Sequence, residues 1–501
     1  MSNTTQLYLE YKNRLQKIAD IKYAGAVLQW DQETYLPIKG NDARGRQIAT
    51  LSELAHEQFT AEKTESLLLE LLNKNDLDER QKRNIELSWY DYQKNKKLPS
   101  SFVRKSSEAI NKSFHSWISA RAENSFAKFE KPLQEVIDLK KEEAALLGYS
   151  DHPYNAMMNE YDTGLTVAFT DNLFSTLIPQ LSILLNQIKR QPQVNNDFLL
   201  KHFDKNIQWD FGIELLKNMH FDFEAGRQDI SEHPFTTNFS SEDVRVTTRI
   251  DENDFGNMTW SCIHEGGHAL YEQGLPKSEY GLPLGEYCSL SIHESQSRLW
   301  ENCIGRSKSY WEYHFPKLKS HFPDPLKDVN LDLFYKGINK VTPSLIRTEA
   351  DELTYHFHVL IRYEIEKKLI EGSIQSKDIP SIWNEYYEKY LGVIVPDDIR
   401  GCLQDVHWSH GSFGYFATYS IGSLYAAQLW NSINNQQVKT IENLKTGDTN
   451  LILYWLRHNI FPFGRFFSSD KLCQKATGES LNAEHFINYV NKKFQPIYNF
   501  P

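Results

Sequence analysis

The chain has 501 residues, of which 40% are hydrophobic and 24% are charged, a composition typical of a globular protein with a large core. Its formal net charge of -11 argues against nucleic acid or an anionic membrane as a partner. The N-terminal residues show no signal-peptide pattern, no stretch is long and apolar enough to span a bilayer, and the five cysteines form no CxxC pair. We therefore expect a cytoplasmic protein with reduced thiols.

The first half of the chain is predicted to be helical. Apolar residues recur at helical spacing from Leu7 onward and again between residues 51 and 72. No cluster of chemically reactive side chains stands out between residues 38 and 230, so this part is predicted to be scaffold. Because no flexible linker or low-complexity run divides the chain, residues 1–501 are expected to form one continuous body.

The spacing of apolar residues changes to that of a β-strand at residues 243–250. β-Branched and polar residues alternate there, in the order Val244, Arg245, Val246, Thr247, Thr248, Arg249 and Ile250. We expect the edge of this strand to accept an extended peptide through main-chain hydrogen bonds. The upstream segment His233-Pro234-Phe235 is a candidate for the same wall.

The most informative stretch is residues 263–270, which contains the pattern H-E-x-x-H. On a helix, His264 and His268 lie one turn apart on one face, so both imidazoles can hold one metal ion. Glu265 is then placed to take a proton from metal-bound water. Metal-assisted hydrolysis needs these parts, because bound zinc lowers the pKa of its water towards ~7 and a carboxylate base completes the deprotonation.

The helix that carries this pattern is predicted to stop at Gly274, which is followed by Pro276. Two glycines inside the helix, Gly266 and Gly267, oppose its formation, because each costs about 1 kcal/mol relative to alanine. We therefore expect substrate or a neighbouring helix to approach the backbone closely at these two positions.

A hydrolytic zinc site normally has three protein ligands, so one more is needed. The pattern of the metzincins would require a histidine six residues after His268, but Gly274 occupies that position. Glu272 lies one turn beyond His268 and would only extend the row of ligands along one helix axis. Glu294 lies on a second predicted helix and can approach from a new direction, which favours it as the third ligand.

Further side chains are candidates for supporting roles. His293 or Glu301, on the same predicted helix as Glu294, could orient a ligand imidazole from behind. Histidines and tyrosines are also dense around glycines from Gly401 to Gly422, as a wall that stabilises an oxyanion would require. From the sequence pattern alone, core packing is the favoured interpretation for most of them.

Together these residues identify a family, because the sequence resembles the carboxypeptidase Taq family of metallocarboxypeptidases. Besides H-E-G-G-H, five motifs of that family occur in its order, namely H-P-F at 233–235, D-x-R-x-T at 243–247, H-E-S-Q at 293–296, I-R-x-x-A-D at 346–351 and G-x-x-Q-D-x-H-W at 401–408. Trp30 to Thr34 and Thr477 to Glu479 are weaker family features.

The resemblance implies a mainly α, elongated fold similar to neurolysin and angiotensin-converting enzyme, with two helical subdomains flanking a long groove and a small β-sheet beside the H-E-x-x-H helix. It implies one divalent metal ion per subunit, zinc or else cobalt, held by His264, His268 and Glu294. It also implies a homodimer that releases C-terminal residues from peptides with broad side-chain tolerance.

Substrate-binding roles follow from the same resemblance. Arg347 is expected to bind the terminal carboxylate of the peptide, because a guanidinium can hold a carboxylate with two hydrogen bonds. Arg245 is the rival for this role, and the structural alternative for Arg347 is an ion pair with Glu349 or Asp351.

The oxyanion is expected to be stabilised by Tyr415 or Tyr419 together with His407 or His410, and His233 is expected to shape the substrate wall. Two other functions stay open: an endo-acting metallo-oligopeptidase on the same fold, and a non-catalytic peptide-binding scaffold. The intact metal ligands and Glu265 count against the scaffold, since binding alone needs no general base beside a metal.

Overall fold

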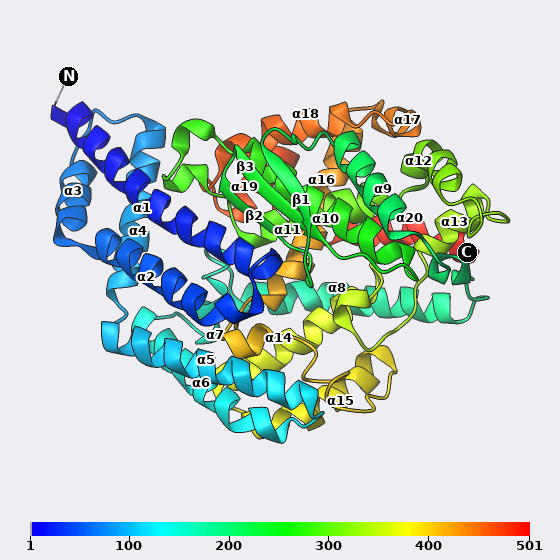
Figure 1. The fold of residues 1–501 in the computed structure, drawn as a ribbon, viewed down its shortest axis with the longest axis horizontal. Helices are drawn as coiled ribbons and strands as arrows, with labels where there is room; N and C mark the ends of the chain where they lie inside the picture. Colours follow the sequence, from blue (N-terminus) through cyan, green and yellow to red (C-terminus); the bar gives the residue numbers. More distant parts are fainter. Residues whose placement is uncertain (1–2, 501) are drawn as a thin grey trace. The chain divides into compact units, whose positions relative to one another are not determined.

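The computed structural model describes residues 3–500, so both ends of the predicted body, residues 1–2 and 501, lie outside the described part. Helices make up most of the chain, and three short strands form one sheet that packs against α10 (Phe255–Gly274) (Figure 1). The prediction of a mainly α fold with a small sheet beside the H-E-x-x-H helix is confirmed.

The chain divides into two compact units, each assembled from three segments. The first unit comprises the chain through Lys96, Asn195–Ile338 and Tyr425–Leu481. The second unit comprises Lys97–Val194, Asn339–Leu424 and the chain from Asn482 onward.

The first unit carries the sheet and α10. Its other helices are α1 (Asn3–Thr34), α2 (Asn41–Thr60), α3 (Glu62–Leu72), α4 (Glu79–Lys96), α9 (Lys205–Asn218), α11 (Leu290–Arg298), α12 (Lys308–His321), α13 (Leu331–Ile338), α17 (Thr440–Lys445), α18 (Asn450–Asn459) and α19 (Ser469–Thr477). A π-helix, η5 (Leu299–Gly305), follows α11 directly. Short 3-10 turns are η1 (Ile38–Gly40), η2 (Asp197–Leu200), η3 (Lys277–Glu279), η4 (Pro283–Gly285) and η9 (Phe461–Phe463).

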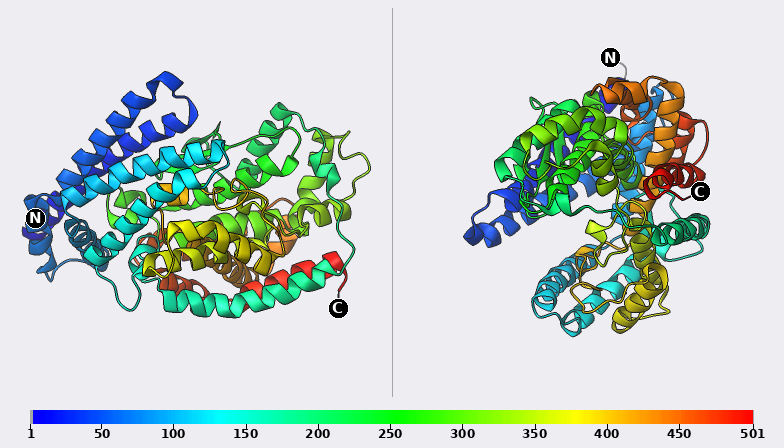
Figure 2. Two further views of the ribbon diagram at one scale, coloured as in Figure 1. Left: turned by 90° about the horizontal axis from the view of Figure 1, so that it is seen from below. Right: turned by 90° about the vertical axis from the view of Figure 1, so that its right-hand side faces the viewer.

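The second unit is helical. Its elements are α5 (Ser100–Ala122), α6 (Ala127–Leu147), α7 (Tyr154–Met158), α8 (Val167–Lys189), η6 (Arg347–Glu349), α14 (Tyr355–Glu371), η7 (Ser376–Asp378), α15 (Ile379–Leu391), η8 (His407–His410) and α20 (Glu484–Tyr498). The C-terminal helix α20, red in Figure 2, packs beside α8. α16 (Phe416–Gln436) has residues in both units.

The strand predicted at residues 243–250 forms as β3 (Asp243–Thr248), but the prediction that its edge is free is wrong. β3 is the central strand, with β1 (Gly226–Ile230) parallel on one side and β2 (Thr236–Ser240) antiparallel on the other. Both of its edges are therefore occupied by hydrogen bonds within the sheet. β2, which directly follows His233-Pro234-Phe235, is a strand at the edge of the sheet.

The two faces of this sheet have different neighbours. Val244 and Val246 of β3 are buried and lie on the face that packs against α10. Arg245 points to the opposite face, where its guanidinium lies 4.3 Å from the ring centre of Trp30 on α1 and 4.8 Å from that of Phe239. Asp243 accepts a hydrogen bond of 2.9 Å from Arg245 Nε. Stacking and an ion pair thus hold Arg245 on the sheet face away from α10.

Helix α10 begins and ends as local chemistry dictates. The Asp254 side chain caps its start by accepting a hydrogen bond from the backbone N–H of Gly256. The helix ends at Gly274 as predicted.

A methyl group on Gly267 would lie 2.7 Å from backbone atoms of Gln296 and Ser297 on α11. The predicted close approach of a neighbouring helix is confirmed, and glycine at 267 lets α10 and α11 meet at backbone distance.

We expect Gly267→Ala to force α10 and α11 apart, because the obstructing atoms belong to backbone and cannot rotate away. Overpacking of this kind costs about 1 to 3 kcal/mol. Metal affinity should fall as well, because the predicted metal ligands lie on both helices. Thermal unfolding and metal titration measure both effects. Gly45→Ala on α2 is the control, since nothing lies within 4 Å of the added methyl and alanine should stabilise that helix by about 0.5 to 1 kcal/mol. Wild-type stability and metal affinity in Gly267→Ala would contradict the expectation.

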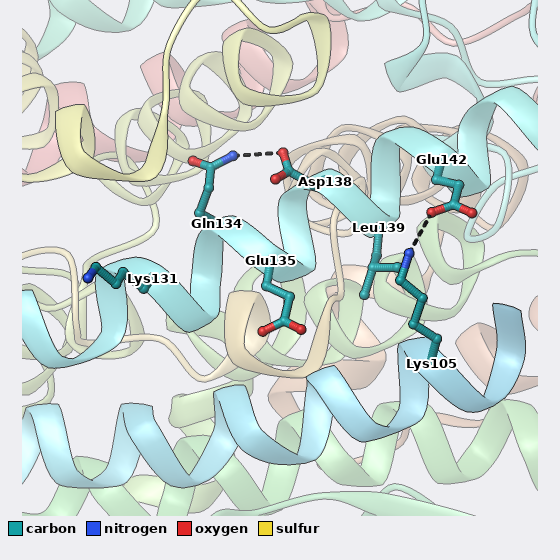
Figure 3. Close-up of a pocket in the computed structure, with 7 residues that line it drawn as sticks. All are labelled: Lys105, Lys131, Gln134, Glu135, Asp138, Leu139 and Glu142. Carbon is teal, nitrogen blue, oxygen red and sulfur yellow. Dashed lines mark hydrogen bonds and ion pairs between the residues drawn. The ribbon is translucent and has the colours of Figure 1, made fainter.

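A surface depression of about 400 Å³ lies on α5 and α6 of the second unit. Figure 3 shows the side chains that line it, which are Lys105, Lys131, Gln134, Glu135, Asp138, Leu139 and Glu142. Charges of both signs meet there, and Lys105 pairs with Glu142 at 3.1 Å. None of the predicted site residues lines this depression.

No helix in the described part of the chain is long and apolar enough to cross a membrane.

Candidate active site

Three potential metal ligands from two helices converge in the first unit. The Nε2 atoms of His264 and His268 on α10 lie 3.7 and 3.4 Å from Oε2 of Glu294 on α11. All three ligand atoms lie within 4.8 Å of one another, a separation that one cation can bridge. Two imidazole nitrogens and one carboxylate oxygen are a donor set that suits zinc and similar divalent ions.

The remaining imidazole nitrogens of both histidines have acceptors or donors behind them. Nδ1 of His264 lies 2.9 Å from Oε2 of Glu301 on η5. Nδ1 of His268 lies 2.6 Å from Nδ1 of His293 on α11. Glu301 and His293, the two candidates for orienting a ligand imidazole, thus each contact the Nδ1 atom of one of these histidines. The residues present fit a metal ion, because the imidazoles are held with Nε2 directed at the common point.

Glu272, the competing ligand candidate, has other partners. Its Oε1 lies 2.7 Å from Nε2 of His293, and its Oε2 accepts a hydrogen bond of 2.6 Å from Nδ2 of Asn238. Glu272 is not among the three side chains whose ligand atoms converge. This geometry favours Glu294 over Glu272 as the third ligand.

The carboxylate of Glu294 is held in its ionised form. Burial raises its pKa, but the charge of Arg298 and the contacts with His264 and His268 outweigh burial and bring the pKa well below the usual range. Arg298 Nε donates a 2.6 Å hydrogen bond to Oε1, the oxygen that faces away from the histidines. Arg298 was not predicted, although its position four residues after Glu294 on a helix was a usable signal.

The general-base candidate Glu265 is buried and lies outside the ligand cluster. Burial raises the pKa of its carboxyl above the ordinary value, against the opposing effects of His264 and of Thr236. The Thr236 hydroxyl on β2 donates a 2.6 Å hydrogen bond to Oε2 of Glu265. Sequence reasoning missed Thr236, because nothing in the pattern of β2 distinguishes it. One oxygen of Glu265 is thus anchored by the protein.

Arg347 lies in the second unit and is buried, with 7% of its side chain exposed. Its Nε and Nη2 donate hydrogen bonds of 3.0 and 2.8 Å to Oδ1 of Asp405, and Nη1 donates one of 3.1 Å to the hydroxyl of Tyr355. Its ion-pair partner therefore belongs to the G-x-x-Q-D-x-H-W motif, and is neither Glu349 nor Asp351. Asp351 instead accepts hydrogen bonds from nearby backbone N–H groups.

Asp405 is shared between two arginines. Arg362 on α14 donates a 2.6 Å hydrogen bond from Nε to Oδ2 of Asp405. Burial raises the pKa of Asp405, but Arg347 and Arg362 outweigh it and hold the pKa well below the usual range. Asp405 therefore remains charged and fixes one edge of the Arg347 guanidinium.

The predicted oxyanion residues gather in the same unit as Arg347. His407 Nε2 lies 3.3 Å from the hydroxyl of Tyr419, and the rings of Tyr415 and Tyr419 lie 5.1 Å apart. Burial, assisted by the charge of Arg347, lowers the pKa of His407 to about 3, so this imidazole is neutral. His410 instead packs against the ring of Phe114 at 4.7 Å.

The last of the predicted substrate residues is His233, which is exposed in the segment before β2. Its backbone carbonyl accepts a 2.7 Å hydrogen bond from the hydroxyl of Ser231. The segment is held in place through its main chain, while the imidazole faces solvent.

An H-E-x-x-H helix whose histidines converge with a glutamate from a second helix, beside a further buried glutamate, is the arrangement expected of a metal-dependent peptidase. The family model of Carboxypeptidase Taq (M32) metallopeptidase matches residues 10–494. Carboxypeptidase 1 of Bacillus subtilis is 36% identical over 491 residues, which cover 98% of each chain. The chain therefore belongs to the carboxypeptidase Taq (M32) family of metallocarboxypeptidases.

Solved structures agree with this assignment. The M32 carboxypeptidase of Deinococcus radiodurans R1 matches with a TM-score of 0.97 at 34% identity, covering 99% of this chain and 100% of that one. A structure named CHT matches with a TM-score of 0.96 at 57% identity, covering 98% of this chain and 99% of that one. The predicted family, the helical fold and the activity of a metal-dependent carboxypeptidase are confirmed.

Proposed function

We propose that this carboxypeptidase trims C-terminal residues from peptides of varied sequence, with one zinc ion, or else cobalt, held by His264, His268 and Glu294. The convergence of these three ligand atoms within 4.8 Å carries the proposal. A cytoplasmic location and a homodimer are part of the proposal. The five free cysteines support the first, and the second rests on the family resemblance.

A divalent cation held by His264, His268 and Glu294 would supply Lewis acidity toward the scissile carbonyl and toward a water molecule. Glu265 accepts the proton of the attacking water. Because Thr236 holds its Oε2 at 2.6 Å, the other oxygen, Oε1, is the one that takes up the proton. The raised pKa of Glu265 suits the next step, in which the same carboxyl returns the proton to the leaving nitrogen.

Charge that develops on the carbonyl oxygen needs hydrogen-bond donors. The hydroxyl groups of Tyr415 and Tyr419 are the proposed donors, with His407 as the neutral imidazole that orients Tyr419. The contact of 3.3 Å between His407 and Tyr419 supports this role. The packing of His410 against Phe114 favours a supporting role for His410.

Arg347 is the proposed ligand of the substrate's terminal carboxylate. Asp405 accepts a hydrogen bond from Nε and one from Nη2, and the hydroxyl of Tyr355 accepts one from Nη1. A guanidinium has five N–H donors, so one hydrogen on each of Nη1 and Nη2 remains beyond these bonds. Two such hydrogens can hold a carboxylate in the fork geometry. Arg245 is the weaker candidate, because it is stacked between Trp30 and Phe239.

The test is the product pattern on two peptides that differ only at the C-terminus, one with a free acid and one amidated. We expect stepwise release of C-terminal residues from the free acid and little cleavage of the amide, because the amide lacks the charge that Arg347 binds. Mass spectrometry of the products, with metal analysis of the purified protein, measures this. Internal cleavage of both peptides at equal rates would instead favour the oligopeptidase, and no cleavage by metal-loaded protein would favour the scaffold.

A further inference from the structure

A chain of four side chains runs from the metal ligand His268 to the edge strand of the sheet. His268 Nδ1 lies 2.6 Å from Nδ1 of His293, whose Nε2 lies 2.7 Å from Oε1 of Glu272. Nδ2 of Asn238 on β2 donates a 2.6 Å hydrogen bond to the other oxygen of Glu272. Glu272 is almost completely buried, with 4% of its side chain exposed.

Metal binding permits only one direction for the protons in this chain. A histidine that binds metal through Nε2 carries its proton on Nδ1. His268 must then donate to Nδ1 of His293, which is therefore unprotonated. His293 consequently carries its own proton on Nε2, where the carboxylate of Glu272 accepts it. Each hydrogen bond fixes the tautomer of the next residue.

The chain also connects the elements that carry the ligands. Glu272 lies one turn after His268 on α10, whereas His293 is the neighbour of the ligand Glu294 on α11. Asn238 adds the edge strand β2. The other histidine ligand, His264, differs because Glu301 contacts its Nδ1 directly. The two ligand imidazoles are thus anchored in different ways, one by a carboxylate and one by a second imidazole.

We propose that His293 and Glu272 are positioning residues that hold His268 in its metal-binding tautomer, with Asn238 as the anchor on β2. This inference rests on the proposed metal site. Glu272 gives the chain its direction, because a carboxylate can only accept a hydrogen bond from His293. Without it, His293 is free to carry its proton on Nδ1 and to face the Nδ1 proton of His268. That conflict is relieved when His268 moves its proton to Nε2, where it blocks the metal.

The test measures the zinc dissociation constant of metal-free protein by competition with a chelator. Loss of a side chain that orients a ligand typically weakens metal binding by about 10- to 100-fold. We expect this range for Glu272→Gln, whose amide can donate as well as accept, and for His293→Phe, which removes the acceptor for His268. The unfolding temperature of the metal-free protein should stay near that of the wild type. Should His293→Phe not fold, Glu272→Gln alone decides, because it keeps the shape of the carboxylate.

Glu279→Gln is the matched control. Glu279 is a buried carboxylate of the same unit that accepts hydrogen bonds from Arg80 and Asn84, outside the chain of contacts to His268. Its zinc affinity should equal that of the wild type. The proposal is overturned if Glu272→Gln binds zinc normally, if Glu279→Gln weakens zinc equally, or if the loss of affinity merely follows a loss of metal-free stability.

Glu294→Ala separates this proposal from the metal site on which it rests. Removal of a ligand should abolish stoichiometric zinc binding. If Glu294→Ala loses zinc while Glu272→Gln and His293→Phe keep wild-type affinity, the positioning role is wrong and the metal site stands. If Glu294→Ala itself keeps wild-type affinity, the metal site is wrong as well.

Discussion

Glu265→Gln is expected to keep its metal and to lose at least about a hundredfold in kcat, the lower end for removal of a general base. The amide has the size of the carboxylate and can still accept the hydrogen bond of Thr236, but it cannot take a proton from water. Because Glu265 lies outside the ligand cluster, metal content should be unchanged. Turnover of a free-acid peptide, together with metal analysis of the same preparation, measures both expectations.

Two outcomes would contradict this role of Glu265. If metal is lost together with activity, Glu265 is a ligand and the base lies elsewhere. If turnover stays at the wild-type level, no proton passes through this side chain. Thr236→Ser is the matched control, because serine keeps the hydroxyl that bonds Oε2 of Glu265, so near wild-type turnover is expected from it.

The cluster of His264, His268 and Glu294 was predictable because its information is local. The spacing of His264 and His268 specifies one face of one helix, and a serine-rich helix start placed Glu294 on a second helix. Gly267 signalled a close approach because glycine is costly inside a helix and must be compensated. The contacts of Arg298 and Glu301 follow from the same helical spacing, with Glu294, Arg298 and Glu301 on one face of α11 and η5.

The sheet was only partly predictable. β3 shows clear alternation, whereas its neighbours have the polar sequences G-R-Q-D-I and T-T-N-F-S and no alternation to reveal them. Without the neighbours, β3 looked like a strand with a free edge. The contacts of Thr236 and Asn238 could not be predicted for the same reason, because they depend on β2 lying beside α10.

Pairs far apart in the sequence could not be assigned from one chain alone. Arg347 and Asp405 are separated by 58 positions. Glu349 and Asp351 lie close to Arg347 in the sequence, so they were the ion-pair partners considered. In the folded protein the buried guanidinium of Arg347 contacts Asp405 instead. The motif that contains Asp405 was recognised in the sequence. Only the three-dimensional contacts show that Asp405 binds Arg347 and Arg362.

Arg347→Ala is expected to lower kcat/KM on free-acid peptides by tens to thousands of times. Truncation of one partner of a desolvated charge pair costs about 2 to 5 kcal/mol, which corresponds to that range. The fold should survive, because Arg362 still pairs with Asp405 at 2.6 Å and keeps that buried carboxylate compensated. Metal content should also be unchanged.

The amidated twin of the same peptide separates substrate binding from a purely structural role of Arg347. It lacks the terminal charge, so wild type should cleave it poorly and Arg347→Ala should hardly change that low rate. A structural role would instead lower both rates together and reduce the unfolding temperature. Arg245→Ala is the matched control, since Arg245 pairs with Asp243 on the sheet face away from α10. If Arg245→Ala erases the preference for a free carboxylate while Arg347→Ala keeps it, the terminal carboxylate is bound by Arg245.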